Sequence, residues 1–188
     1  NLRDHRHVTS LLHSIRTVEN GVFVTPTMSF DERGHRPNGT TYFVCGYDEA
    51  GEAPEDFYPT VQDFIGEGGN FERPEAVVKN LAGVPAGSAF AGCEAVGGLH
   101  FKERILAPGE TAGYTIMTGA VRAAEHAGET ILRMTAAYRT AAQTTAAYES
   151  MKAYWEQKVN VSYHTKDRRF DRYMQWVSFQ PILRRIYG

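Results

Sequence analysis

Histidine is the residue type in this sequence with the clearest capacity for metal binding. His5 and His7 stand two positions apart, so on a strand they would share one face, a spacing that is found in zinc sites. The sequence places no third ligand beside them, and His13 and His35 are equally compatible with an exposed surface. We therefore predict no metal centre and assign no metal-binding residue.

Acidic side chains are concentrated in one stretch, from Asp48 to Asp56, where five acids fall within nine positions. Such a group could supply a general acid or bind a metal through oxygen. Metal loops with oxygen ligands need acids at fixed alternate positions around a tight turn, whereas these acids are scattered around Gly51 and Pro54. The pattern favours a solvated loop.

The other reactive residue types lack the context that catalysis needs. Cys45 and Cys93 belong to no CxxC motif, and the chain has no Gly-x-Ser-x-Gly elbow. The glycines between Gly66 and Gly69 could cradle a phosphate, but no strand leads into them and no P-loop lysine follows. We predict no self-contained active site: no catalytic residue is assigned, and the substrate-binding residues are unknown.

Composition indicates an ordinary water-exposed domain. The 188 residues carry 20 Lys+Arg against 22 Asp+Glu, and neither sign clusters, which argues against nucleic acid and against an anionic membrane as partners. No run approaches the roughly 18 uncharged apolar residues that span a bilayer. Two cysteines fit a reducing compartment, so we expect a cytoplasmic protein.

Residues 1–122 have the pattern of an antiparallel β-sandwich. Asn20-Gly21, followed by the β-rich run VFVTPTMSF, predicts a hairpin, and Pro26 places its second strand at an edge or a bulge. Residues 31–39 are predicted to be a polar connection. The run TTYFVCGY that begins at Thr40 predicts a third strand.

The stretch from Asp48 to Gly87 is expected to be long and irregular, with two short helices, one capped by Thr60 and one opened by Pro74. If sandwich loops reach an active site, this stretch is the best candidate, because functional loops exceed the usual connection length.

Strands resume at Ala89 in the predicted structure. The runs LHFKERIL and TAGYTIMTGAV are separated by Pro108-Gly109, a type II turn signal that predicts either a second hairpin or a corner between sheets. On a continuous strand the side chains of Leu99, Phe101, Glu103 and Ile105 would share one face.

The hydrophobic period becomes helical after Ala123, and residues 123–165 are predicted to form a helical linker that lies on the sandwich. Its stripe is typical of packing and not of a ligand platform. The stripe consists of Tyr148, Met151, Trp155 and Val159.

Residues 166–188 predict a further helix, capped by Asp167 or Thr165 and kinked by Pro181. This helix is apolar almost all round, as is typical of a helix enclosed by neighbours. Because the chain begins without methionine and offers no such neighbours, we expect it to be a piece of a longer protein.

The order of several segments resembles the N-terminal half of the glycoside hydrolase family 94 phosphorylases. These segments are SFDERGHRPNGTTYFVCGYDE, DFIGEGGNFERPEAV, ERILAPGETAGYTI, an alanine-rich helix, and FDRYMQWVSFQPILRRIYG. Phe64-Ile65-Gly66 with Arg73-Pro74-Glu75-Ala76 is similar to the family's FLG…NPEA segment, with arginine in place of the usual asparagine.

The resemblance implies a super-sandwich, a helical linker, and residues 166–188 as the first helix of an (α/α)6 barrel whose remainder lies beyond Gly188. It implies phosphorolysis of a β-glucoside to α-glucose 1-phosphate, with inorganic phosphate as co-substrate, no cofactor, and the catalytic acid in the barrel. The final segment is most similar to members that act on longer oligosaccharides, so β-1,2-glucan is the expected substrate.

The expected partners are a gluco-oligosaccharide and phosphate, and the barrel, on which this chain would pack; a homodimer stays open. An arginine fork suits phosphate, but pairing between helices is favoured for Gln180, Arg184 and Arg185. Two alternatives remain: a free-standing carbohydrate-binding or assembly module, and a hydrolase with the same layout.

Overall fold

The computed structural model describes residues 11–31, 34–122, 126–159 and 161–187. The chain divides into two compact units, residues 1–144 and 145–188. The first unit contains the described strands, and the second contains most of the last two helices. The predicted fold class, antiparallel β-structure followed by C-terminal helices, is confirmed.

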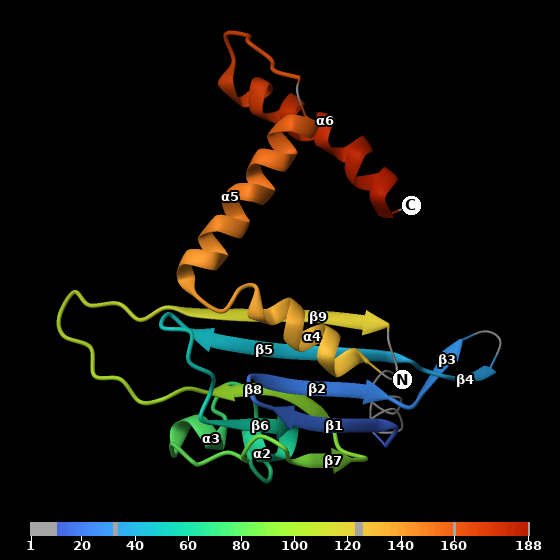
Figure 1. Ribbon diagram of the computed structural model, residues 1–188, viewed down its shortest axis with the longest axis vertical. Coiled ribbons are helices and arrows are strands. Elements are labelled where there is room, and N and C mark those ends of the chain that lie inside the picture. The colour runs from blue at the N-terminus through green and yellow to red at the C-terminus, as the bar shows by residue number, and fades with distance from the viewer. Residues whose placement is uncertain (1–10, 32–33, 123–125, 160, 188) are drawn as a thin grey trace. The chain divides into compact units, whose positions relative to one another are not determined.

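The first unit is built on one five-stranded antiparallel sheet (Figure 1). In spatial order its strands are β7 (Ala89–Ala91), β1 (His13–Val18), β2 (Gly21–Pro26), β5 (Thr40–Asp48) and β9 (Tyr114–Arg122). Two strand pairs accompany it: β3 (Met28–Asp31) with β4 (Gly34–Pro37), and β6 (Asp56–Thr60) with β8 (Ala95–His100).

Helix α4 (Ala127–Ala136) covers one face of the large sheet, across β5 and β9 (Figure 1). Ile131 of α4 is fully buried against Phe23, Phe43 and Cys45. The rings of Phe23 and Phe43 meet edge-on, with centroids 6.5 Å apart, a favoured arrangement for aromatic pairs. A helix from beyond the last strand therefore completes this part of the core.

The opposite face of the large sheet is covered by the β6–β8 pair. Ile15 of β1, Val22 of β2 and Phe57 of β6 form its buried cluster, and Leu99 of β8 packs against them. Val22 and Phe23 are adjacent in β2 yet point to opposite faces, as strand geometry requires. The large sheet is thus the middle layer between a helix and a second, smaller sheet.

Cys45 lies in the cluster under α4 and has no exposed surface. Burial disfavours the thiolate and raises the pKa of Cys45 to about 12. At neutral pH this residue is an inert apolar side chain, as buried free cysteines usually are.

The hairpin predicted at Asn20-Gly21 is confirmed, although the turn signal acts through another mechanism. Strands β1 and β2 pair from Val18↔Gly21 to His13↔Pro26, but neither Asn20 nor Gly21 adopts the positive φ of a type I′ turn. Instead, Asn20 is buried and donates through Nδ2 to the Tyr47 hydroxyl at 2.8 Å. Asn20 is therefore required by its contact with Tyr47, and Gly21 by the close approach of β5, since a methyl group there would lie 2.2 Å from the Val44 carbonyl oxygen.

Pro26 does not place β2 at an edge, because β2 lies between β1 and β5. The pairing of β2 with β5 ends at Val24↔Tyr42, so Pro26, which has no N–H to donate, stands beyond it. The predicted polar connection at 31–39 was also wrong in part, since Gly34–Pro37 forms β4 and pairs with β3.

The prediction of an irregular stretch from Asp48 to Gly87 did not include strand β6, which the structure has at Asp56–Thr60. The predicted run LHFKERIL is strand only as far as His100, and Ile105 is 93% exposed, so the shared face predicted for Leu99 to Ile105 was wrong. The turn predicted at Pro108-Gly109 has its backbone hydrogen bond, in which Glu110 N donates to the Ala107 carbonyl oxygen at 2.9 Å. Because β8 pairs with β6 and β9 with β5, this segment is a corner between sheets.

Both short helices are present. Helix α2 (Val61–Ile65) is capped by Thr60, whose Oγ1 accepts from Asp63 N at 3.1 Å. Helix α3 (Glu75–Val78) follows Pro74.

The predicted linker consists of two helices, α4 and α5 (Ala141–Lys158). The last helix, α6 (Arg168–Tyr187), is capped by Asp167, whose Oδ1 accepts from Arg169 N at 2.8 Å, and it contains Pro181. No described helix is long and apolar enough to cross a bilayer.

Candidate functional site

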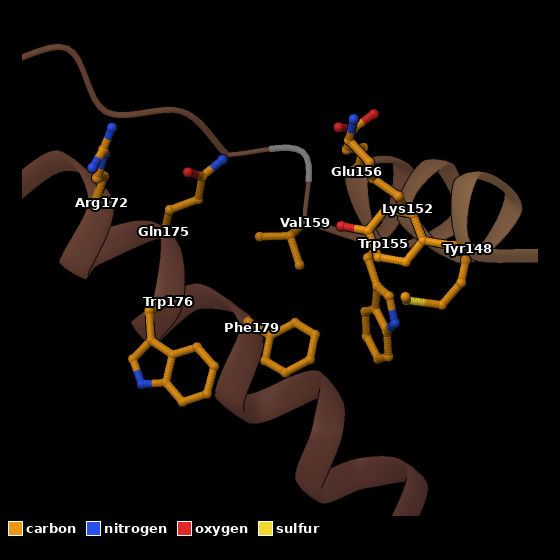
Figure 2. Close-up of a pocket in the computed structure, with 10 residues that line it drawn as sticks. Tyr148, Lys152, Trp155, Glu156, Val159, Arg172, Gln175, Trp176 and Phe179 are labelled. Atoms are coloured by element: carbon orange, nitrogen blue, oxygen red, sulfur yellow. The ribbon is translucent and has the colours of Figure 1, made fainter. Parts of the chain in front are cut away.

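The second unit contains a groove of about 440 Å³ between α5 and α6 (Figure 2). Its floor is aromatic and its rim is charged or polar. The lining residues are Tyr148, Met151, Lys152, Trp155, Glu156 and Val159 from the α5 side, and Arg172, Gln175, Trp176 and Phe179 from α6.

The aromatic floor is held together by ring contacts within this unit. Trp155 of α5 lies 4.4 Å from Phe179 of α6 between centroids, and Phe179 stacks on Trp176 at 5.7 Å. Figure 2 shows Trp155 and Phe179 facing the space between the two helices. Contacts at these distances stabilise helix packing, which supports the predicted packing role of the stripe.

The four stripe residues predicted from the sequence all line this groove. The alanine-rich stretch was predicted to be one helix, which was wrong, because residues 137–140 separate α4 from α5. Helix α4 packs on the sheet, and Trp155 of α5 contacts Phe179 of α6.

Aromatic rings that remain exposed could also bind a ligand. Trp176 is 59% exposed and Tyr148 is 58% exposed, and flat exposed rings can stack on the apolar faces of other ring systems. Lys152 and Glu156 on one side, with Arg172 and Gln175 on the other, offer hydrogen-bond donors and acceptors. The groove thus offers both stacking surfaces and hydrogen-bonding groups to a small polar ring compound.

The polar residues near the C-terminus that were weighed as phosphate ligands, and for which pairing between helices was favoured, do not gather at this groove. Gln180 is partly buried, Arg184 is exposed, and neither lines the groove; the side chain of Arg185 lies outside the described part. Arg172 and Gln175 were missed, although they precede Phe179 by seven and four positions on the same helix, a spacing that puts all three on one face.

The histidines weighed as metal ligands form no cluster within the described residues. His5 and His7 fall outside the described residues, as does the side chain of His35. The Nδ1 atom of His13 is buried without a hydrogen-bond partner. Within the described residues no group of three or more His, Cys, Asp or Glu side chains could hold a metal ion.

A histidine–carboxylate pair that the sequence did not indicate joins β6 to β8. His100 Nδ1 lies 2.7 Å from Asp56 Oδ1, and the two residues are direct cross-strand partners. Tyr58 packs on the His100 ring and donates to the Leu81 carbonyl; burial, and secondarily Asp56, raise the pKa of Tyr58. Since 44 positions separate the pair, only the strand pairing could have revealed it.

Three of the five acids between Asp48 and Asp56 have side-chain partners: Asp48, Glu49 and Asp56. Asp48 Oδ1 accepts from two backbone N–H groups of its own turn, Ala50 and Glu52, and Glu49 pairs with Arg104 at 2.7 Å. Gly66 lies against the Glu75 carboxylate, whose negative charge is unfavourable for a phosphate.

Comparison with known protein families identifies the first unit. Residues 4–140 match the family model described as "Glycosyl hydrolase 94, supersandwich domain". The chain belongs to glycosyl hydrolase family 94. No curated protein matches this family 94 chain.

The family 94 match includes the segments around Gly66 and Pro108 that carried the resemblance. It ends at residue 140, so the aromatic groove of α5 and α6 lies outside it. The likeness of residues 170–188 to a first barrel helix stays a prediction.

Proposed function

We propose that this chain is the N-terminal, non-catalytic part of an inverting glycoside phosphorylase. The observation that carries the proposal is the match of residues 4–140 to the family 94 supersandwich model. The substrate is a β-linked gluco-oligosaccharide, with β-1,2-glucan favoured, which makes the parent protein a 1,2-β-oligoglucan phosphorylase of the cytoplasm.

The proposed reaction follows the inverting glycosidase scheme with phosphate in place of water. A carboxylic acid protonates the glycosidic oxygen as its bond to the anomeric carbon breaks, and a phosphate oxygen bonds to that carbon from the opposite face. Phosphate is already anionic, so no general base is needed. We assign the acid to no residue of this chain; it belongs to the (α/α)6 barrel in the proposed protein.

The polypeptide that carries this chain is expected to release α-glucose 1-phosphate from β-1,2-linked gluco-oligosaccharides only when phosphate is present. The assay compares β-1,2-, β-1,3- and β-1,4-linked substrates with and without phosphate, and proton NMR identifies the anomer. A β-anomer would contradict inversion. Glucose release without phosphate would indicate the related hydrolase.

A carbohydrate-binding module is the second candidate, because exposed aromatic rings line the groove of α5 and α6. Both tryptophans of the chain, Trp155 and Trp176, lie there, so tryptophan fluorescence reports on this groove directly. Under the phosphorylase proposal, gluco-oligosaccharides should leave the fluorescence of the 188-residue chain unchanged. A saturable change that is lost in Trp176→Ala would favour the binding module.

A further inference from the structure

Strand β9 lies at one margin of the five-stranded sheet, and no described strand pairs with its outer side (Figure 1). It pairs with β5 in an unbroken register from Asp48↔Tyr114 to Thr40↔Arg122. The strand at the opposite margin, β7, has three residues, whereas β9 has nine. Sheet margins are usually protected by short strands, prolines, bulges or charges. Strand β9 is long, unbulged and free of proline, so it offers a template for another strand.

The hydrogen bonds of β5 show which backbone groups of β9 point outward. Gly46 N donates to the Asn20 carbonyl oxygen at 2.8 Å, so the even-numbered residues of β5 direct their N–H and C=O groups toward β2. The odd-numbered residues of β5 direct theirs toward β9, because these groups alternate along an antiparallel strand. Since Cys45 is opposite Met117, the odd-numbered residues of β9 form these bonds. Its even-numbered residues therefore direct their N–H and C=O groups away from the sheet.

The side chains of the same even-numbered residues are exposed on the face of the sheet opposite α4. Met117 and Val121 pack against the cluster under α4, so the alternate positions face the other way. Two of these are large: Tyr114 is 45% exposed and Ile116 is 51% exposed. A second strand could thus reach both the free backbone groups and the side chains beside them. The outward residues, all exposed, are Tyr114, Ile116, Thr118, Ala120 and Arg122.

These outward residues are complementary to a second copy of β9 that lies antiparallel to the first. A two-fold axis at Thr118 places this residue opposite its own copy. The same axis places Ile116 opposite Ala120, which is an apolar pair. It also places Tyr114 opposite Arg122, where a cation meets an aromatic ring. Each position therefore faces a compatible partner.

The charge of β9 favours the antiparallel arrangement over the parallel one. Arg122 is the one charged residue in this strand. A parallel pair of β9 strands in register would place Arg122 opposite its own copy, and like charges directly opposite one another are destabilising. The antiparallel pair keeps the two arginines at opposite ends of the interface.

We propose that two copies of this chain associate through β9, which joins their five-stranded sheets across a two-fold axis at Thr118. Opposite outward residues exchange both of their backbone hydrogen bonds in such a pair, and strand addition of this kind is a common mode of recognition. A strand of nine residues is about 30 Å long, which makes a narrow interface and a reversible, concentration-dependent dimer. All of these residues belong to the first unit, and the inference is independent of the proposed phosphorylase activity.

Sedimentation equilibrium of the full 188-residue chain tests the proposal. The mass should rise with concentration from 21.0 kDa toward twice that value. Thr118→Lys places two ammonium groups opposite one another at the axis, and Thr118→Glu places two carboxylates there, so each variant alone should stay a monomer. An equimolar mixture of the two variants should form dimers again, because each lysine then faces a glutamate.

Ala91→Lys is the matched control for these substitutions. Ala91 is exposed on β7, at the other margin of the sheet, so this variant should dimerise as the unsubstituted chain does. Circular dichroism checks that each variant keeps its secondary structure. A monomer at every concentration, a dimer that Thr118→Lys leaves intact, or a mixture of the two Thr118 variants that stays monomeric would overturn the proposal.

Discussion

Phe23→Ala is expected to destabilise the first unit by roughly 3–5 kcal/mol, the range for removing a fully buried phenylalanine. Phe23 is 1% exposed and contributes to the cluster with Phe43, Cys45 and Ile131. Alanine would remove the edge-on contact with Phe43 and leave a cavity between the sheet and α4. Urea unfolding followed by far-ultraviolet circular dichroism measures the loss.

The control for this substitution is Phe71→Ala. Phe71 is 55% exposed and loses much less contact, so its cost should stay within about 1 kcal/mol. Circular dichroism is used in place of tryptophan fluorescence. Both tryptophans, Trp155 and Trp176, belong to the second unit, so their fluorescence would not report on the unfolding of the first. Equal costs for the two substitutions would contradict the position assigned to α4.

Gly21→Ala is expected to cost roughly 3 kcal/mol, the upper end of the range for overpacking. A methyl group at Gly21 would lie 2.2 Å from the Val44 carbonyl oxygen and 2.7 Å from Cys45 Sγ. The first neighbour is backbone, so β2 and β5 would have to separate. The thermal midpoint and the free energy of unfolding in urea both report this cost.

Gly113→Ala provides the comparison for Gly21→Ala. Its added methyl would meet only Glu49, at 3.6 Å or more, an ordinary contact distance. We expect a change within about 0.5 kcal/mol. If Gly21→Ala were equally mild, the close pairing of β2 with β5 would be wrong.

The sequence predicted the elements whose signals are local. The hairpin, strand β5 and the Thr60 cap each depend on residues within a few positions of one another. The role of Asn20-Gly21 in that hairpin was not predictable, because it depends on Val44 and Tyr47 on another strand.

Elements that depend on distant partners were missed. Strand β6 is short, contains Pro59, and is defined by its pairing with β8 some forty positions later. The division between α4 and α5, by contrast, had a local signal that was overlooked: Thr140 and Gln143 have the spacing of a capping box. Of the residues that line the candidate groove, the sequence predicted the stripe on α5 but not Arg172 and Gln175 on α6.

Helix α4 has a consequence for how this protein can be divided experimentally. The last strand ends at Arg122, yet the side chain of Ile131 fills the space above Phe23 and Phe43. A shortened gene that stops after the last strand would encode a sheet with one apolar face open to water, and such a face favours aggregation. Expression of the β-rich part alone should therefore extend beyond Ala136, so that the helix remains with the interior that it closes.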